Sequence, residues 1–167
     1  MFKVGDYIVC GHNGVCKVEQ IGILEKSGDG RLFYTLAPVE DKTAHIFTPV
    51  DNVKMTMRPV MTRQEALNLV ESMSGLCGLV FPENDKRENT YKAVLKRCDP
   101  EELARLIKTI YERRRVRRLS GKKEMVTDAK YFKMAKKQLY GEIAAVLSME
   151  TDQVQCMIKD RMHHSAD

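Results

Sequence analysis

The apolar residues of this chain change their spacing near residue 62, and this change limits the possible folds more than any other feature. Before it, short apolar runs are separated by turns rich in Gly, Asn, Asp and Pro. Such runs, with no helical spacing between them, are typical of small antiparallel β-structures. After it, apolar residues recur every three or four positions, the period of an amphipathic helix. The 167 residues therefore predict an α+β chain of two small domains.

The first domain, residues 1–58, is expected to be a small SH3/Tudor-like antiparallel β-barrel. Turn residues such as Lys26–Gly30 tolerate positive φ and predict a hairpin loop. Short strands at this spacing favour a barrel. The expected strands are 7–9, 15–21, 32–37 and 43–48, with a short fifth strand around 52–55.

The second domain, residues 62–164, is expected to be all-α with about five helices. Thr62–Glu65 has the spacing of a capping box. Asp99-Pro100 predicts the N-cap and first residue of a later helix. Ser120 is expected to cap the N-terminus of the following helix. The tail from His163 is expected to fray.

The sequence contains no P-loop, dinucleotide-binding glycine motif, zinc-protease motif or nucleophile elbow. Cys10, His12 and Cys16 lie close enough to offer three metal ligands, but no fourth ligand has suitable spacing. Two small buried thiols on neighbouring strands are therefore the favoured interpretation. We expect no enzymatic activity, no metal and no cofactor.

Positive charge is concentrated in the helical part. Residues 1–60 carry seven basic and seven acidic residues, whereas residues 84–140 carry 18 basic and 8 acidic residues. Five of the six residues 113–118 are arginine, more than the capping of a helix C-terminus by cations requires. Such a surplus, next to the expected N-terminus of another helix, is typical of a surface that binds a polyanion. It favours nucleic acid over a merely solvated helical surface.

The β-part carries no net charge, so we do not expect it to bind DNA electrostatically. Small barrels expose edge strands, which can pair with a partner strand by β-augmentation. The expected strand 43–48 places Ile46 and Phe47 on opposite faces. Whether one of the two is exposed, or an adjoining helix covers that face, stays open at this stage.

Several segments together resemble the CarD/CdnL family of bacterial RNA polymerase-binding transcription regulators. The opening Phe2–Val9 followed by His12–Val15 is the most specific part. The same β-module occurs in transcription-repair coupling factors, whose motor domains do not fit within 167 residues. The resemblance covers nearly the whole chain. Its further segments are Val18-Glu19 with Ile21, Tyr34–Leu36, Ile46–Pro49, Tyr91-Lys92 with Leu95, and Leu119–Gly121.

The resemblance implies a transcription regulator whose barrel docks on the RNA polymerase β subunit through an edge strand. Its helical domain would contact promoter DNA, largely independently of sequence, and stabilise the open complex. It further implies a cytoplasmic, nucleoid-associated protein with no membrane partner and no small-molecule substrate. The residues expected to contact polymerase are His45, Ile46, Phe47, Thr48 and Pro49. Those expected to contact DNA are Arg87, Lys92, Arg114, Arg118, Lys122, Lys123 and Lys130.

Two positions depart from the family pattern. The family often places a Trp in the second helical region, and the matching position is near Arg87 in a chain with no Trp. An Arg can enter a narrow minor groove, but it does not unstack base pairs as an apolar wedge does. Phe47 stands where some relatives present an Arg, which predicts a more apolar polymerase contact.

Two alternatives from other classes stay open. The first is a protein–protein adaptor whose basic helices bind an acidic partner without binding DNA; salt-dependent DNA association separates it from the main interpretation. The second is a free-standing, sequence-specific repressor. Such repressors are usually dimers that read two half-sites, so a monomer would count against this reading.

Overall fold

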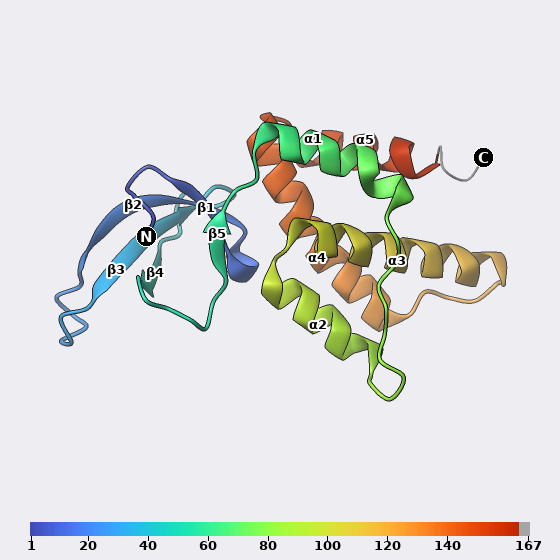
Figure 1. Ribbon diagram of the computed structural model, residues 1–167, viewed down its shortest axis with the longest axis horizontal. Coiled ribbons are helices and arrows are strands. Elements are labelled where there is room, and N and C mark those ends of the chain that lie inside the picture. The colour runs from blue at the N-terminus through green and yellow to red at the C-terminus, as the bar shows by residue number, and fades with distance from the viewer. Residues whose placement is uncertain (164–167) are drawn as a thin grey trace. The chain divides into compact units, whose positions relative to one another are not determined.

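The computed structural model describes residues 1–163. The chain divides into two compact units, Met1–Val60 and Met61–Asp167, of which the first is a β-sheet and the second is helical (Figure 1). The α+β class is therefore confirmed. His164, the predicted end of the helical domain, and the predicted frayed tail beyond His163 lie outside the described residues. Within residues 1–163, none of the helices is both long and apolar enough to cross a bilayer.

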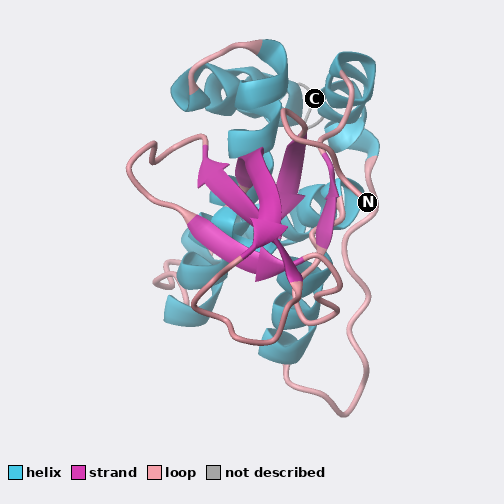
Figure 2. Cartoon of the chain, turned by 90° about the vertical axis from the view of Figure 1, so that its left-hand side faces the viewer, coloured by secondary structure: helices cyan, strands magenta, loops and turns pink. Residues whose placement is uncertain are grey.

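The first unit is a single twisted antiparallel sheet (Figure 2). Its strand order is β4-β3-β2-β1-β5, so β4 and β5 are the two edges and the sheet is not closed. The prediction of a small antiparallel β-unit of five short strands is confirmed, although the sheet does not close into the expected barrel. Both edge strands are short and contain a proline, which has no N–H for a closing ladder. The strands are β1 Tyr7–Cys10, β2 Val15–Ile23, β3 Leu32–Pro38, β4 Ile46–Pro49 and β5 Met57–Pro59.

The fifth strand lies later in the chain than the sequence predicted. The predicted segment 52–55 is a turn, in which Asn52 Oδ1 accepts a hydrogen bond from the Lys54 N–H at 2.9 Å. Asn52 Nδ2 in turn donates to Thr48 Oγ1 at 2.8 Å. These side-chain bonds hold the backbone in a turn, so the strand that pairs with β1 begins only at Met57.

Alternate residues of the central strands form the core of the sheet unit. Cys10 and Cys16 are both free and buried in this cluster, as the favoured interpretation expected. The other buried members are Ile8, Val18, Tyr34 and Leu36. Gly11 has φ +49°, and a Cβ there would lie 3.0 Å from Met55 Cγ. A side chain at this position would therefore disturb the turn between β1 and β2.

Over residues 61–163, the described part of the second unit, there are five α-helices, as predicted. The long helices α3 and α4 pack along each other, and their buried faces share one core with α1, α2 and α5 (Figure 1). Because all five faces meet in this core, the position of each helix surface is set by its neighbours. The helices are α1 Arg63–Ser72, α2 Arg87–Arg97, α3 Pro100–Leu119, α4 Val126–Leu147 and α5 Thr151–His163.

Two of the three predicted helix caps are confirmed. Thr62 and Glu65 form a reciprocal capping box at α1, and the Asp99 side chain accepts a hydrogen bond from the Glu102 N–H at the start of α3. Ser120 does not cap α4, because its hydroxyl donates to the Val116 carbonyl and it ends α3 instead. The next helix therefore starts only at Val126.

Candidate functional site

Strand β4 displays one large apolar side chain to solvent. Phe47 is 54% exposed, whereas Thr48 is only 2% exposed. Ile46 packs against the core of the sheet. In the ladder with β3, Phe47 lies opposite Thr35 and Thr48 lies opposite Tyr34. Since side chains alternate between the faces of a strand, Ile46 and Thr48 point inward and Phe47 points outward.

The neighbours of Phe47 hold the strand and flank its exposed part. Thr48 accepts the hydrogen bond from Asn52, so its hydroxyl is used inside the unit. His45 precedes the strand, with its Nδ1 3.3 Å from Glu19 Oε2. Pro49 ends it. Of the five predicted polymerase contacts, Thr48 is thus a supporting residue whose side chain faces the interior.

Arg87 is the first residue of α2 and is exposed. Its guanidinium carbon lies 4.3 Å from the centroid of the Phe81 ring, a cation–π contact. Because the ring supports the guanidinium, less side-chain entropy is lost when Arg87 binds an anion.

Two more of the predicted DNA-binding residues, Lys92 and Lys130, lie near Glu88, the residue that follows Arg87. Lys92 Nζ lies 3.5 Å from Glu88 Oε1, which also accepts a hydrogen bond from the Tyr131 hydroxyl at 2.7 Å. Lys130 Nζ lies 5.3 Å from the centroid of the Tyr131 ring. The bond from Tyr131 and the charges of Lys92 and Lys130 lower the pKa of Glu88. The carboxylate stays ionised and offsets part of the positive charge here.

Arg114 and Arg118 lie on a different face of α3 from the one that adjoins Arg87. Both line a cavity of about 340 Å³ between α3, α4 and α5, and Arg114 Nε lies 2.5 Å from Glu124 Oε1. Arg113 and Arg117 instead line a second cavity together with Arg87. The predicted DNA-binding residues on the helices therefore form two groups, one around Arg87 and one around Arg114 and Arg118.

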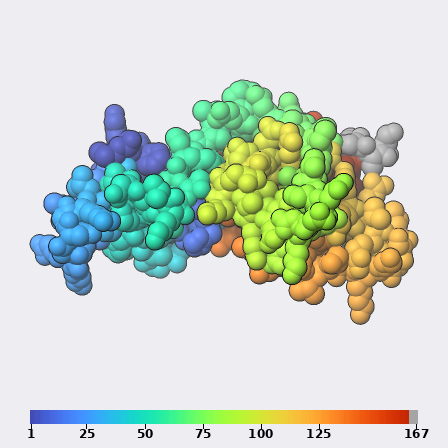
Figure 3. All heavy atoms as spheres, turned by 60° about the horizontal axis from the view of Figure 1, so that its bottom comes forward, coloured from blue at the N-terminus to red at the C-terminus, as the bar shows by residue number. Residues whose placement is uncertain are grey.

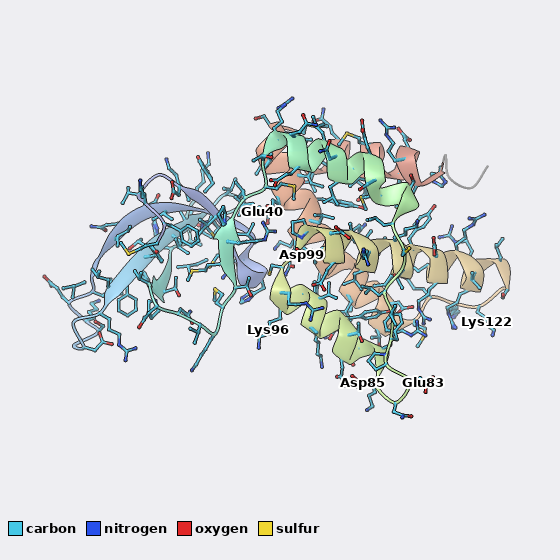
Figure 4. All side chains as sticks on the ribbon, in the orientation of Figure 1. Glu40, Glu83, Asp85, Lys96, Asp99 and Lys122 are labelled. Atoms are coloured by element: carbon cyan, nitrogen blue, oxygen red, sulfur yellow. The ribbon has the colours of Figure 1, made fainter. Side chains whose placement is uncertain are left out.

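Lys122 and Lys123 are exposed in the segment 120–125, which links α3 to α4. Arg117 Nε donates to the Lys123 carbonyl at 2.8 Å, which holds the segment against the end of α3. Figure 4 shows Lys122 at this end of the helical unit. In Figure 3 the linking segment (orange) and the loop before α2 (lime green) both reach the visible face. The two lysines extend the basic surface beyond α3.

Three further basic residues, which were not predicted as site residues from the sequence, belong to the group around Arg114 and Arg118. They are Arg115, Lys136 and Lys159, which line the same cavity. Lys159 lies on α5, far along the chain from Arg118. Helical spacing indicates which residues share a face of one helix, but it does not indicate which other helix that face meets, so the sequence held no signal for this cluster.

A buried carboxylate joins α2, α3 and α4. Asp128, whose side chain is 3% exposed, accepts a hydrogen bond from the Tyr91 hydroxyl at 2.9 Å. It also accepts one from Arg113 Nε at 3.0 Å. Asp128 lies in the first turn of α4, where a negative charge interacts favourably with the helix dipole. The charge of Arg113 is therefore neutralised by Asp128 within the helical unit.

Ionisation of the tyrosines should report this network. Burial and the bond to Asp128 raise the pKa of Tyr91 to about 12. In the unfolded chain a tyrosine pKa is about 10, so this contribution to stability is complete below about pH 10 and is lost as the pH rises through about 12. We expect Tyr91→Phe to remove one of the last phenolate steps from an absorbance titration of the folded protein.

The urea-unfolded protein is the control for this titration, because its tyrosines should all ionise together near pH 10. Burial and the bond to Glu88 also raise the pKa of Tyr131 to about 12, so a late step should remain in the variant. If Tyr91→Phe reduces the absorbance change only near pH 10, where exposed tyrosines ionise, the raised pKa does not belong to Tyr91.

The sheet unit thus has an exposed aromatic residue on an edge strand, and the helical unit carries the surplus of positive charge. Residues 2–61 match the family model of the CarD-like/TRCF RID domain, and the N-terminal unit is therefore a domain of this family. The match ends where the helical unit begins, so the resemblance of the helical segments stays a prediction. Comparison with curated proteins gives no significant match.

Proposed function

We propose that this protein is a transcription regulator that binds the RNA polymerase β subunit through β4 and promoter DNA through its helical unit. The observation that carries the proposal is the CarD-like/TRCF RID domain at residues 2–61, because this domain family is regulatory and interacts with RNA polymerase. Its edge strand β4 supplies the docking position, with Phe47 exposed on it.

Two properties of β4 support a role in docking. As the outermost strand it can pair with a strand of a partner through backbone hydrogen bonds. Phe47 adds an aromatic anchor, and aromatic residues are enriched among those that contribute most to binding. Backbone pairing would provide the alignment, and the Phe47 side chain would provide most of the affinity.

The charge of the helical unit supports DNA as the second partner. Arg87, Lys92, Lys122, Lys123 and Lys130 are all exposed. Arg114 and Arg118 belong to the cavity group. A protein held by both polymerase and DNA stabilises the open complex only if it binds the melted state more tightly than the closed one. We propose that the helical unit supplies this difference at the edge of the melted DNA.

The polymerase contact is tested by calorimetry of the full-length chain with a purified fragment of the bacterial RNA polymerase β subunit. Saturable one-to-one binding would support the proposal. Absence of binding by a folded protein would remove the polymerase contact and with it the proposed function.

The DNA contact is tested by charge reversal. Lys122→Glu with Lys123→Glu should weaken binding to a promoter duplex, because both side chains are exposed and neither lies in a helix or the core. If each lysine neutralises one phosphate, the slope of log affinity against log salt should become shallower by about 2. Fluorescence anisotropy at several salt concentrations measures both quantities.

A matched control reverses the same amount of charge elsewhere. Lys26→Glu with Lys42→Glu changes two exposed lysines of the sheet unit and should leave the salt slope unchanged. Equal weakening by both pairs would indicate a response to net charge alone. No salt-dependent DNA binding by the unaltered protein would favour the adaptor that binds an acidic partner.

A further inference from the structure

The cavity between α3, α4 and α5 has properties that DNA binding does not require. It measures about 340 Å³, which is within the size range of small-molecule sites. Five basic side chains line it, contributed by three helices, and none of its described lining residues is Asp or Glu. The five are Arg114, Arg115, Arg118, Lys136 and Lys159.

Helical spacing brings these residues together on rigid elements. On α3, Arg118 lies one turn after both Arg114 (i,i+4) and Arg115 (i,i+3), so its side chain is a neighbour of both. Lys136 follows Phe132 by one turn on α4, and Lys159 lies on the face of α5 that meets them. Side chains carried by three packed helices are positioned more precisely than those on a loop.

One aromatic ring, that of Phe132, contacts two of the cations. The Arg114 guanidinium carbon lies 4.6 Å, and Lys136 Nζ 4.7 Å, from the centroid of the Phe132 ring. The rings of Tyr111 and Tyr140 also line the cavity. These rings provide flat apolar surface beside concentrated positive charge, which suits a ligand with both a planar group and an anionic group.

The positive charges are not fully compensated. Glu124 pairs with Arg114, but within residues 1–163 no ion pair is recorded for Arg115, Arg118 or Lys159. Burial and the nearby Arg114 and Lys159 lower the pKa of Lys136. An anion in the cavity would relieve this repulsion, and the mutual repulsion of the cations is a source of binding energy for it.

We propose that this cavity binds a small molecule that carries two or more phosphate groups, such as a nucleoside polyphosphate. Five cations exceed what one phosphate can contact, and Arg binds phosphate oxygens in a bidentate manner. The cavity is concave, and Arg114 and Lys136 are half-buried in it, whereas the phosphates of a duplex are presented on a convex surface. This geometry favours a free ligand over the DNA backbone at Arg114 and Arg118. The proposed DNA contact is then left to the exposed residues outside the cavity, which are Arg87, Lys92, Lys122, Lys123 and Lys130.

The test uses the full-length chain, with inorganic tripolyphosphate and a nucleoside triphosphate as probes in calorimetry at physiological ionic strength. Both probes are expected to bind saturably with one-to-one stoichiometry. Lys136→Met should weaken binding by about tenfold or more, because it removes a charge-assisted contact while keeping an apolar stem of similar length. Lys133→Met is the matched control, since Lys133 is an exposed lysine of α4 that does not line the cavity.

Three results would overturn the proposal. They are absence of saturable binding by both probes, equal weakening by Lys133→Met and Lys136→Met, and loss of duplex DNA binding in Lys136→Met without any tripolyphosphate binding by the unaltered protein. The last result would assign the cavity to the DNA backbone. If Lys136→Met does not fold, Lys159→Gln replaces it, because Lys159 is exposed on α5 and lines the same cavity.

Discussion

Phe47→Asp is expected to weaken binding of the full-length chain to the RNA polymerase β subunit by about 100-fold. The side chain is 54% exposed at the centre of an edge strand, so its loss removes an aromatic anchor without opening the core. Aromatic anchors of this kind contribute about 2–4 kcal/mol, and a carboxylate in their place would be desolvated by the partner. Calorimetry with the β subunit fragment measures the change.

Val4→Asp is the matched control for Phe47→Asp. Val4 is 61% exposed in the same unit but precedes β1, which is separated from β4 by two strands in the sheet order. It should bind the β subunit as the unaltered protein does. If Val4→Asp weakens binding as much as Phe47→Asp, or if Phe47→Asp binds normally, β4 is not the docking strand. Thermal unfolding of both variants checks that the sheet unit remains folded.

Asp128→Ala is expected to destabilise the helical unit by about 3 kcal/mol. Removing the carboxylate leaves two buried or half-buried partners, Tyr91 and Arg113, without their acceptor. Tyr91 is fully buried, so its hydroxyl would be left without its acceptor. Arg113 is 26% exposed and can turn partly to water, which places the effect at the lower end of the range for buried pairs. Urea unfolding measures the change in the free energy of unfolding.

Asp152→Ala separates burial from the helix-dipole contribution. Asp152 lies in the first turn of α5, as Asp128 lies in the first turn of α4, but it is exposed. Its loss should cost only about 0.5 kcal/mol. Equal effects of the two substitutions would show that the buried hydrogen bonds add nothing. A double-mutant cycle with Tyr91→Phe measures the coupling within the network directly.

Features that depend on a few neighbouring residues were predicted well from the sequence. The capping box at Thr62 and the Asp99-Pro100 helix start are formed by side chains that contact backbone groups three residues away. Strand alternation also identified the opposite orientations of Ile46 and Phe47. These signals are reliable because their partners lie within one turn or one strand.

Features that depend on competition between partners were predicted less well. Ser120 can cap either the helix before it or the helix after it, and its hydroxyl bonds to the Val116 carbonyl of the former. Residues 52–55 have the composition of a strand, but the side chain of Asn52 holds them in a turn. In both cases the local pattern allowed two outcomes and hydrogen bonding selected one.

The distribution of the site residues could not be predicted because it depends on how helices pack. Composition located the positive charge in residues 84–140. It did not show that Asp128 neutralises Arg113, or that Arg114 and Arg118 face α5 rather than the surface around Arg87. Charge density along a chain is a one-dimensional quantity, whereas the sorting of neighbouring arginines onto different faces is a property of the folded unit.

The shortness of β4 has a kinetic consequence. A partner strand can form a ladder along only four residues, and Pro49 offers no N–H to it. Few backbone bonds must break for such a complex to separate, so its lifetime depends mainly on how well the partner encloses Phe47. Such a complex would therefore exchange with free partner molecules more readily than one held by a longer ladder.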